Sequence, residues 1–203
     1  FRTDHHWSGY GAYLGYVGFL KAHGSTDAAK AKDGASSSLR TEIPSYEDLG
    51  MTMLSDEFYG TLYSKVLLDS LQADAVETPA AALDADCKVT IEGKTYDSVY
   101  FKEFLNKKDK YAAYFGGNYD KVDVEMKDTE AGKKGSILII KDSFANSFVP
   151  FLMNDYSKIS MIDTRYYRGD VEKLAGEYDE VLVLYGIDNF ASEKISLTNA
   201  LLR

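Results

Sequence analysis

The sequence predicts an α/β protein whose sheet is mainly parallel. Three short, almost continuous apolar runs occupy residues 136–140, 158–162 and 180–184 in the last third of the chain. Each run starts the same number of residues after the one before it, and this spacing leaves room for a crossover helix between consecutive runs. Strands that are apolar on both faces are typical of parallel sheets covered by helices. The pattern therefore favours successive βαβ units, which are almost always right-handed.

Composition sets the first limits on function. The chain has 203 residues, of which 45% are hydrophobic, so it can bury a sizeable core. Its formal net charge of −9 argues against a nucleic-acid groove or a dock for anionic lipids, because both need clustered lysines and arginines. No stretch approaches the roughly 18 consecutive apolar residues of a transmembrane helix. We therefore expect neither a nucleic-acid partner nor insertion of this chain into a membrane.

The chain is expected to begin with a helix and a polar excursion inside a single domain. Residues 10–21 carry an apolar stripe at helical spacing, and Gly24 is the expected end of the helix. The stripe consists of Tyr13, Leu14, Val17 and Leu20. Residues 24–38 contain no large apolar side chain and are predicted to form a polar loop or insertion. No linker divides the chain, so residues 1–203 are predicted to form one domain.

The middle of the chain is less regular. Its short apolar pieces between residues 39 and 91 do not identify the type of each element, except at the end of that stretch. Residues 87–91 are predicted to form a strand that leads into a turn at 92–94, and Gly116-Gly117-Asn118 marks a later break in the backbone. The single cysteine, Cys87, excludes an internal disulfide and a zinc site with several thiolate ligands.

A serine follows the first apolar run, at the point where open α/β sheets bind their ligands. Ser143 lies in Lys141-Asp142-Ser143, at the predicted turn from strand to helix. A nucleophilic serine needs such an exposed position and a backbone N–H that donates to a developing oxyanion. Asp and Ser are also common at helix N-termini, so the same pair has a purely structural explanation.

The segments after the second and third runs supply further candidates. Gly169 offers a backbone N–H and Asn189 a side-chain N–H to the same oxyanion, although loop glycines and capping asparagines are common without a function. Three tyrosines at the predicted strand ends are candidates to stack on sugar rings, namely Tyr166, Tyr167 and Tyr185. Filling half-buried positions explains the many tyrosines of the chain equally well.

Only three histidines, His5, His6 and His23, are present to serve as a general base for Ser143. Asp4 precedes His6 by two residues, and on a turn its carboxylate can reach the imidazole Nδ1 while Nε2 faces a neighbour. This arrangement requires the N-terminal segment to fold back over the strand ends. The same cluster offers zinc ligands, but no thiolate pair completes a site, and we predict neither a metal nor a cofactor.

Several motifs resemble, in the same order, those of the DHHW protein family. The signature itself is Thr3-Asp4-His5-His6-Trp7-Ser8. The other similar stretches cover most of the chain and comprise residues 56–65, 108–111, 115–118, 141–147, 162–167 and 184–190. Residues 24–38 are the part least similar to the family. Several motifs that agree in order are far more specific than any one of them.

This resemblance implies a fold and a reaction. The DHHW family is similar to SGNH hydrolase-like enzymes and, among them, to the periplasmic enzymes that O-acetylate alginate. In those enzymes an Asp-x-His pair precedes the nucleophilic serine in the chain. The resemblance implies a flavodoxin-like SGNH domain, a three-layer α/β/α arrangement with a mainly parallel sheet.

The family's functional residues correspond to positions of this chain. By resemblance, Ser143 is the nucleophile, His6 is the general base and Asp4 is the carboxylate that orients the base. The oxyanion donors correspond to the Ser143 N–H, Gly169 and Asn189. The usual superfamily block is Gly-Asp-Ser, and Lys141 takes the place of its glycine here.

The expected function is serine-dependent acyl transfer on a cell-surface or exported polysaccharide, as an O-acetyltransferase or an O-acetylesterase. The expected partner is an acetylated carbohydrate, and the acyl donor is not identified. The chain has neither an initiator methionine nor a signal peptide at its start, so we expect a targeting or anchor segment upstream and a location outside the cytoplasm. Two alternatives stay open: an inactive surface module that binds glycan or protein, and a lipase-like esterase for longer acyl chains.

Overall fold

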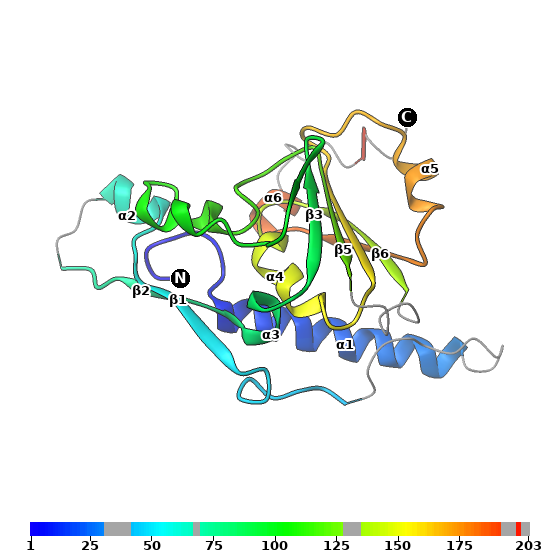
Figure 1. The fold of residues 1–203 in the computed structure, drawn as a ribbon, viewed down its shortest axis with the longest axis horizontal. Coiled ribbons are helices and arrows are strands. Elements are labelled where there is room, and N and C mark those ends of the chain that lie inside the picture. The colour runs from blue at the N-terminus through cyan, green and yellow to red at the C-terminus, as the bar shows by residue number, and fades with distance from the viewer. Residues whose placement is uncertain (31–41, 67–69, 128–134, 192–197, 200–203) are drawn as a thin grey trace.

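Two sheets and a long N-terminal helix are the main elements of the computed structural model (Figure 1). It describes residues 1–30, 42–66, 70–127, 135–191 and 198–199, and residues 24–30 by their backbone alone. The helices are α1 (Gly9–Lys30), α2 (Thr61–Val66), α3 (Ala80–Leu83), α4 (Ala145–Leu152), α5 (Val171–Ala175) and α6 (Ile187–Ala191), with the 3-10 helices η2 (Lys102–Asn106) and η3 (Lys110–Ala113). The strands are β1 (Met51–Phe58), β2 (Asp74–Pro79), β3 (Cys87–Ile91), β4 (Lys94–Tyr96), β5 (Lys121–Met126), β6 (Ser136–Lys141), β7 (Lys158–Asp163) and β8 (Glu180–Leu184).

The main sheet has 6 strands in the order β4-β3-β5-β7-β6-β8. The apolar runs form β6, β7 and β8, and β6 pairs in parallel with both of the others, as their spacing predicts. α4 connects β6 to β7, and α5 connects β7 to β8. The pairs β3–β4, β3–β5 and β5–β7 are antiparallel, however. The prediction of a mainly parallel, flavodoxin-like three-layer sandwich is therefore wrong, and the sheet is mixed.

The antiparallel half of the sheet follows from a different sequence pattern. In β5, buried Val122 and Val124 alternate with more exposed polar residues. In β3, buried Cys87, Val89 and Ile91 alternate with more polar residues in the same way. Such alternation is typical of antiparallel strands with one face on the core. The prediction extended the pattern of the three almost continuous apolar runs to the whole sheet, and for that reason it missed the antiparallel pairs.

The predictions for individual elements in the middle of the chain are confirmed. The strand at 87–91 is β3, and the turn after it leads directly into β4. Glu92 and Gly93 adopt left-handed φ angles of 49° and 76° in this turn. Gly116 and Gly117, with φ angles of 75° and 131°, break the backbone between η3 and β5.

The N-terminal helix differs from its prediction in length and in orientation. α1 continues through Gly24, so the first part of the predicted polar segment 24–38 is helical, and residues 31–38 lie outside the described residues. Leu14, which belongs to the predicted stripe, is 51% exposed. The side chains that the helix buries are Ala12, Tyr16 and Leu20. Their spacing of four residues places them on one face of the helix.

Apolar side chains cover both faces of the main sheet. The larger core lies between the sheet, α1 and α4, and its members include Tyr16, Ile137, Ile139 and Phe148. The smaller core lies on the other face, next to α5, and consists of Leu138, Ile140, Ile162, Val171 and Leu174. β6 contributes alternate residues to the two cores, which explains its continuous apolar run. The turn that carries Ser143 follows directly after this buried strand.

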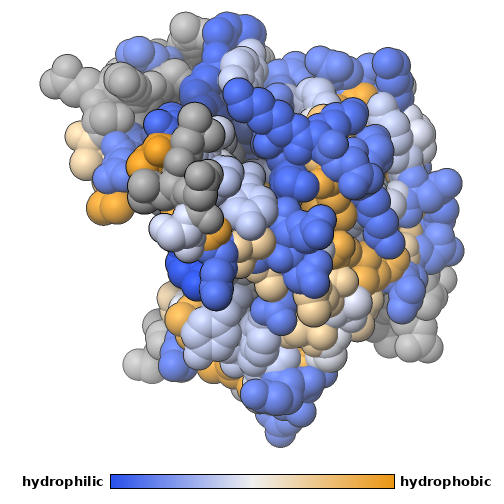
Figure 2. All heavy atoms as spheres, turned by 90° about the vertical axis from the view of Figure 1, so that its left-hand side faces the viewer, coloured by the Kyte–Doolittle hydropathy of each residue, from blue (hydrophilic) through white to orange (hydrophobic). Residues whose placement is uncertain are grey.

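The face of the molecule that carries α2, β1 and β2 shows hydrophobic side chains between hydrophilic ones (Figure 2). The large apolar side chains exposed on these elements are Met53, Leu62 and Val66. β1 and β2 form a separate antiparallel pair near the N-terminal end of α1 (Figure 1). Among the described residues, no helix has the length and apolar character needed to cross a membrane.

Candidate active site

Asp4, His6 and Ser143 lie in one hydrogen-bonded chain. His6 Nδ1 is 2.5 Å from Asp4 Oδ1, and His6 Nε2 is 2.7 Å from Ser143 Oγ. All three residues are buried. A carboxylate beside Nδ1 favours the tautomer that carries its proton there, which leaves Nε2 to accept the serine proton. The structure thus brings together the three side chains that the sequence singled out, and the N-terminal segment does fold back over the end of β6.

The turn between β6 and α4 positions Ser143. Asp142 shapes this turn, because its Oδ1 accepts the Phe144 N–H at 3.0 Å and its Oδ2 accepts the Gly186 N–H at 2.8 Å. The second bond ties the turn to the loop after β8. A Cβ atom at Gly186 would overlap the Phe144 ring, so this close approach requires glycine. Within the described ranges, the Ser143 N–H has no acceptor and is free to donate to a ligand.

The Asp4 carboxylate is held by donors from two parts of the chain. Its Oδ2 accepts the Thr61 N–H at 2.7 Å, and its Oδ1 accepts the His6 N–H at 3.0 Å. Burial alone would raise the pKa of Asp4, but the hydrogen bonds from His6 and Thr61 outweigh it and hold that pKa well below its usual value. A Cβ atom at Gly60 would overlap Asp4, so glycine lets the chain approach the carboxylate closely. Asp4 is therefore ionised at neutral pH.

The rings of Tyr111, His5 and Phe144 pack against His6. The Tyr111 ring is stacked on it, with centroids 3.6 Å apart and an interplanar angle of 5°, and the His5 ring lies at 3.9 Å. The Tyr111 hydroxyl donates to Ser143 O at 2.9 Å, so this tyrosine contacts both the base and the backbone of the serine. The sequence placed Tyr111 in a family-like motif at 108–111, but its role was not predicted.

Contacts with β2 and α4 anchor the N-terminal segment. Asp74 in β2 accepts the Thr3 N–H at 2.8 Å and the Thr3 hydroxyl at 2.6 Å. Trp7 Nε1 donates to Ser147 Oγ in α4 at 2.8 Å. The Trp7 ring also packs so closely on α1 that a Cβ atom at Gly15 would overlap it. These contacts on both sides of Asp4 and His6 hold the two residues over the end of β6.

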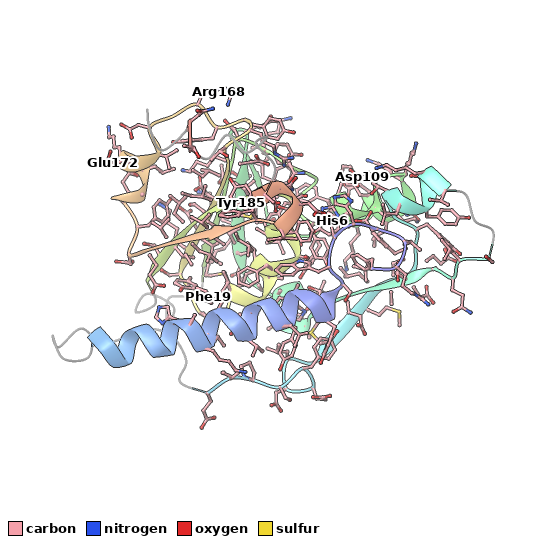
Figure 3. The ribbon with its side chains drawn as sticks, turned by 180° about the vertical axis from the view of Figure 1, so that it is seen from behind. His6, Phe19, Asp109, Arg168, Glu172 and Tyr185 are labelled. Atoms are coloured by element: carbon pink, nitrogen blue, oxygen red, sulfur yellow. The ribbon has the colours of Figure 1, made fainter. Side chains whose placement is uncertain are left out.

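Gly169 does not join the hydrogen-bonded chain. It packs against the ring of its near neighbour Tyr167, which a Cβ atom at position 169 would overlap. Arg168, the residue before it, lies well away from His6 in Figure 3.

Asn189 is engaged elsewhere in the site. Its Nδ2 donates to Asp142 Oδ2 at 2.7 Å, beside the bond from the Gly186 N–H. This amide therefore supports the carboxylate that shapes the Ser143 turn.

The three tyrosines predicted to stack on sugar rings lie in different surroundings. Tyr167 and Tyr185 pack against the smaller core, on the face of the sheet that α5 covers. The Tyr185 hydroxyl is also 3.0 Å from Thr164 Oγ1. Tyr166 is 51% exposed, and its ring centroid lies 5.4 Å from the Arg165 guanidinium.

One group in the described part of the chain gathers atoms that are typical metal ligands. One ligand atom each from Asp4, His5 and His6 lie within 4.8 Å of one another. Ligands bound at about 2.0–2.1 Å in a tetrahedral zinc site are roughly 3.3 Å apart. The 2.5 Å between Asp4 Oδ1 and His6 Nδ1 is shorter, so these two atoms are placed for a hydrogen bond and would have to separate to share an ion.

Three solved structures have the same fold. A DHHW family protein from Eubacterium siraeum is 20% identical with a TM-score of 0.66, and the match covers 100% of this chain and 64% of that protein. Bacillus cereus PatB1 with a sulfonyl adduct is 24% identical with a TM-score of 0.70, over 97% of this chain and 63% of PatB1. Another structure of B. cereus PatB1 is 24% identical with a TM-score of 0.71, over 95% and 64% of the two chains. The present chain thus spans slightly less than two thirds of each of these proteins.

Comparison of the amino-acid sequence with known proteins identifies the family of this chain. A search of curated proteins gave no match. A model of the DHHW protein family matches residues 1–162, which include Asp4, His6 and Ser143. Because this match extends over most of the chain, the protein belongs to the DHHW family.

Proposed function

We propose that this protein is a serine-dependent acyl-transfer enzyme, an O-acetyltransferase or O-acetylesterase of polysaccharides. The observation that carries the proposal is the chain of hydrogen bonds from Asp4 through His6 to Ser143. A buried ionised carboxylate, an imidazole and a serine hydroxyl in this order are the groups that activate a serine nucleophile. Membership of the DHHW family is compatible with acyl transfer. The proposed substrate, an exported or cell-surface polysaccharide, places the enzyme outside the cytoplasm.

The proposed reaction has two half-reactions. In the first, Ser143 Oγ bonds to the carbonyl carbon of an acetyl ester while the hydroxyl proton moves to His6 Nε2. The carbonyl oxygen takes up the electron pair and becomes an oxyanion. When this intermediate collapses, the ester C–O bond breaks and the leaving alcohol takes the proton from His6. Asp4 stabilises the imidazolium that exists between these two proton transfers.

The second half-reaction returns Ser143 to its starting state. A sugar hydroxyl or a water molecule gives its proton to His6 and attacks the acetyl carbon. The bond between the acetyl group and Ser143 then breaks, and Ser143 Oγ recovers the proton. Transfer to a sugar makes the protein an O-acetyltransferase, and transfer to water makes it an O-acetylesterase.

Turnover of 4-nitrophenyl acetate tests the proposal directly. We expect the wild type to release 4-nitrophenol and Ser143→Ala to fall to the rate without enzyme. Ser136→Ala is the matched control, because Ser136 lies at the opposite end of the same strand. Turnover that survives in Ser143→Ala would show that another group is the nucleophile.

A covalent probe gives a second readout that does not depend on which acyl donor the protein uses. Sulfonyl fluorides modify activated hydroxyl groups, and PatB1 is described with a sulfonyl adduct. We expect phenylmethylsulfonyl fluoride to add one sulfonyl group to the wild type, seen by intact-protein mass spectrometry, and none to Ser143→Ala. A wild type that gives neither turnover nor adduct would contradict the proposal and favour the inactive binding module.

A further inference from the structure

A buried lysine lies under the turn that carries Ser143. Lys141 is the last residue of β6, and only 1% of its surface is exposed. Its Nζ donates to Asn118 Oδ1 at 2.8 Å and to Asn146 Oδ1 at 2.9 Å. Both partners are neutral, and among the described residues no carboxylate forms an ion pair with this ammonium group. A buried cation without a paired carboxylate is costly, which is characteristic of functional positions.

The lysine determines which way the Asn118 amide faces. An ammonium group donates and cannot accept, so the atom of Asn118 that faces Lys141 must be the carbonyl oxygen Oδ1. Asn146 Nδ2 donates to the same oxygen at 3.3 Å. With Oδ1 held by two donors, Nδ2 must point in another direction, and it has no acceptor within the described ranges. Asn118 is exposed, so its N–H groups remain open to a ligand.

The loop that carries Asn118 is fastened to the Ser143 turn. The Asn146 N–H donates to Ser143 O at 3.2 Å, so Asn146 lies in the first turn after the serine. Its side chain also donates to Gly117 O at 3.3 Å. Tyr111, which also precedes Asn118 in the chain, donates to Ser143 O. Asn118 is therefore tied to the turn that carries the nucleophile through Gly117, Tyr111 and its own contact with Asn146.

We propose that Lys141 is a positioning residue that orients Asn118 so that Asn118 Nδ2, together with the Ser143 N–H, donates to the oxyanion. The inference rests on the proposed acyl transfer and names the groups that stabilise its charged intermediate. Asn189 is engaged by Asp142, and it would have to release that carboxylate to act in the same way. The Lys141 ammonium also places a positive charge beside the Asn118 amide that would donate to the oxyanion.

The Asn118→Asp variant distinguishes a role of Asn118 as a hydrogen-bond donor to the oxyanion from a purely structural role. The carboxylate keeps an oxygen for Lys141 and Asn146 and adds an ion pair, but it removes the donating NH2 group. We expect kcat for 4-nitrophenyl acetate to fall on the order of 10²–10³-fold, the typical effect of losing one oxyanion donor, with KM much less affected. The melting temperature should stay the same or rise. Asn154→Asp is the control, because it makes the same charge change at an exposed position. A kcat equal to that of this control would overturn the assignment.

A double-mutant cycle tests the positioning role of Lys141. Lys141→Met keeps a long side chain and removes the donor, and we expect it to lower kcat in the Asn118 background. In the Asn118→Ala background it should cause no further loss, because Lys141 would act through a group that is already absent. Independent, additive losses would overturn the role of Lys141 as a positioning residue. If Lys141→Met does not fold, Asn118→Asp remains the deciding variant.

Ser143→Ala, measured beside these variants, distinguishes a failure of the proposed acyl transfer through Ser143 from a failure of the role assigned to Asn118. If the wild type and Ser143→Ala turn over the ester equally, acyl transfer through Ser143 is wrong and the inference falls with it. If Ser143→Ala is inactive while Asn118→Asp matches Asn154→Asp, only the assignment of Asn118 fails.

Discussion

The two halves of the candidate site are built in different ways. Ser143 lies where a buried strand turns into a helix, and its sequence neighbour Asp142 shapes that turn. Asp4 and His6 belong instead to a segment without helix or strand, which distant residues such as Thr61 hold in place. The nucleophile half, residues 141–143, is thus part of the core of the sheet. The base half, Asp4 and His6, packs against the end of the sheet from outside.

This difference predicts how substitutions act on the two halves. A residue of the base half packs on the surface of the sheet, so its loss should reduce activity more than stability. A residue of the nucleophile half belongs to the buried framework, so its loss should change both quantities.

His6→Ala should have the largest effect. A positioned general base contributes about 10²–10⁴-fold to the rate, and we expect kcat/KM for 4-nitrophenyl acetate to fall by an amount in that range. Stability should change much less, because the anchors of the segment at Thr3 and Trp7 remain. Both quantities can be measured on one preparation, by ester turnover and by thermal unfolding.

His5→Ala is the matched control for this substitution. His5 is exposed and contacts Thr61 Oγ1 at 2.9 Å, but within the described ranges it makes no hydrogen bond with Ser143. We expect it to keep most of the activity. Equal losses in His5→Ala and His6→Ala would mean that the segment as a whole, and not the His6 base, supports the reaction.

The nucleophile half should show a pH-dependent stability that originates from Lys141. Burial lowers the pKa of Lys141 from 10.5 to about 8, with Asp163 and Asp142 raising it and Arg165 lowering it further. Between pH 8 and 10.5 the unfolded state binds more protons at this residue than the folded state, so the folded state gains stability as the pH rises. The shift corresponds to roughly 3 kcal/mol at most.

Denaturant unfolding of the wild type and Lys141→Met at several pH values checks this. The difference in unfolding free energy should be constant below pH 8 and should shift in favour of the wild type as the pH rises to 10. Other groups that titrate in this range cancel in the difference. A constant difference across the whole range would mean that Lys141 keeps its ordinary pKa and that its burial costs little.

Tyr111→Phe sharpens the contrast, because Tyr111 contacts both halves. The phenylalanine ring keeps the stacking on His6 but removes the hydroxyl that donates to Ser143 O and contacts Ser147 Oγ. We expect the unfolding free energy to fall by about 1–2 kcal/mol, since buried partners lose a hydrogen bond. The loss of activity should be much smaller than for His6→Ala. A loss as large as that of His6→Ala would show that the two halves act as one unit.

How much of the structure can be predicted from the sequence depends on how far apart in the chain the contacting residues lie. The strands β6, β7 and β8 were predicted because each carries its own apolar pattern. The antiparallel pairing of β5 with β7 was not, because it joins distant segments and the alternation within β5 does not identify its partner strand. The positions of Asp4, His6 and Ser143 followed from family-like motifs. Tyr111 and Thr61 were not assigned a role, because only the folded chain brings them to the site.

The anchoring of the N-terminal segment has a consequence for the order of folding. The hydrogen bond between His6 and Ser143 joins residues separated by 137 positions, so it closes a very long loop. Closing such a loop costs chain entropy that the local β6–α4 turn does not have to overcome. The segment has no helix or strand of its own and is held mainly through side-chain contacts with residues such as Asp74, Thr61 and Ser147, so it should open more readily than the sheet. Trp7 is the only tryptophan of the chain, and its fluorescence would report that opening as an event separate from global unfolding.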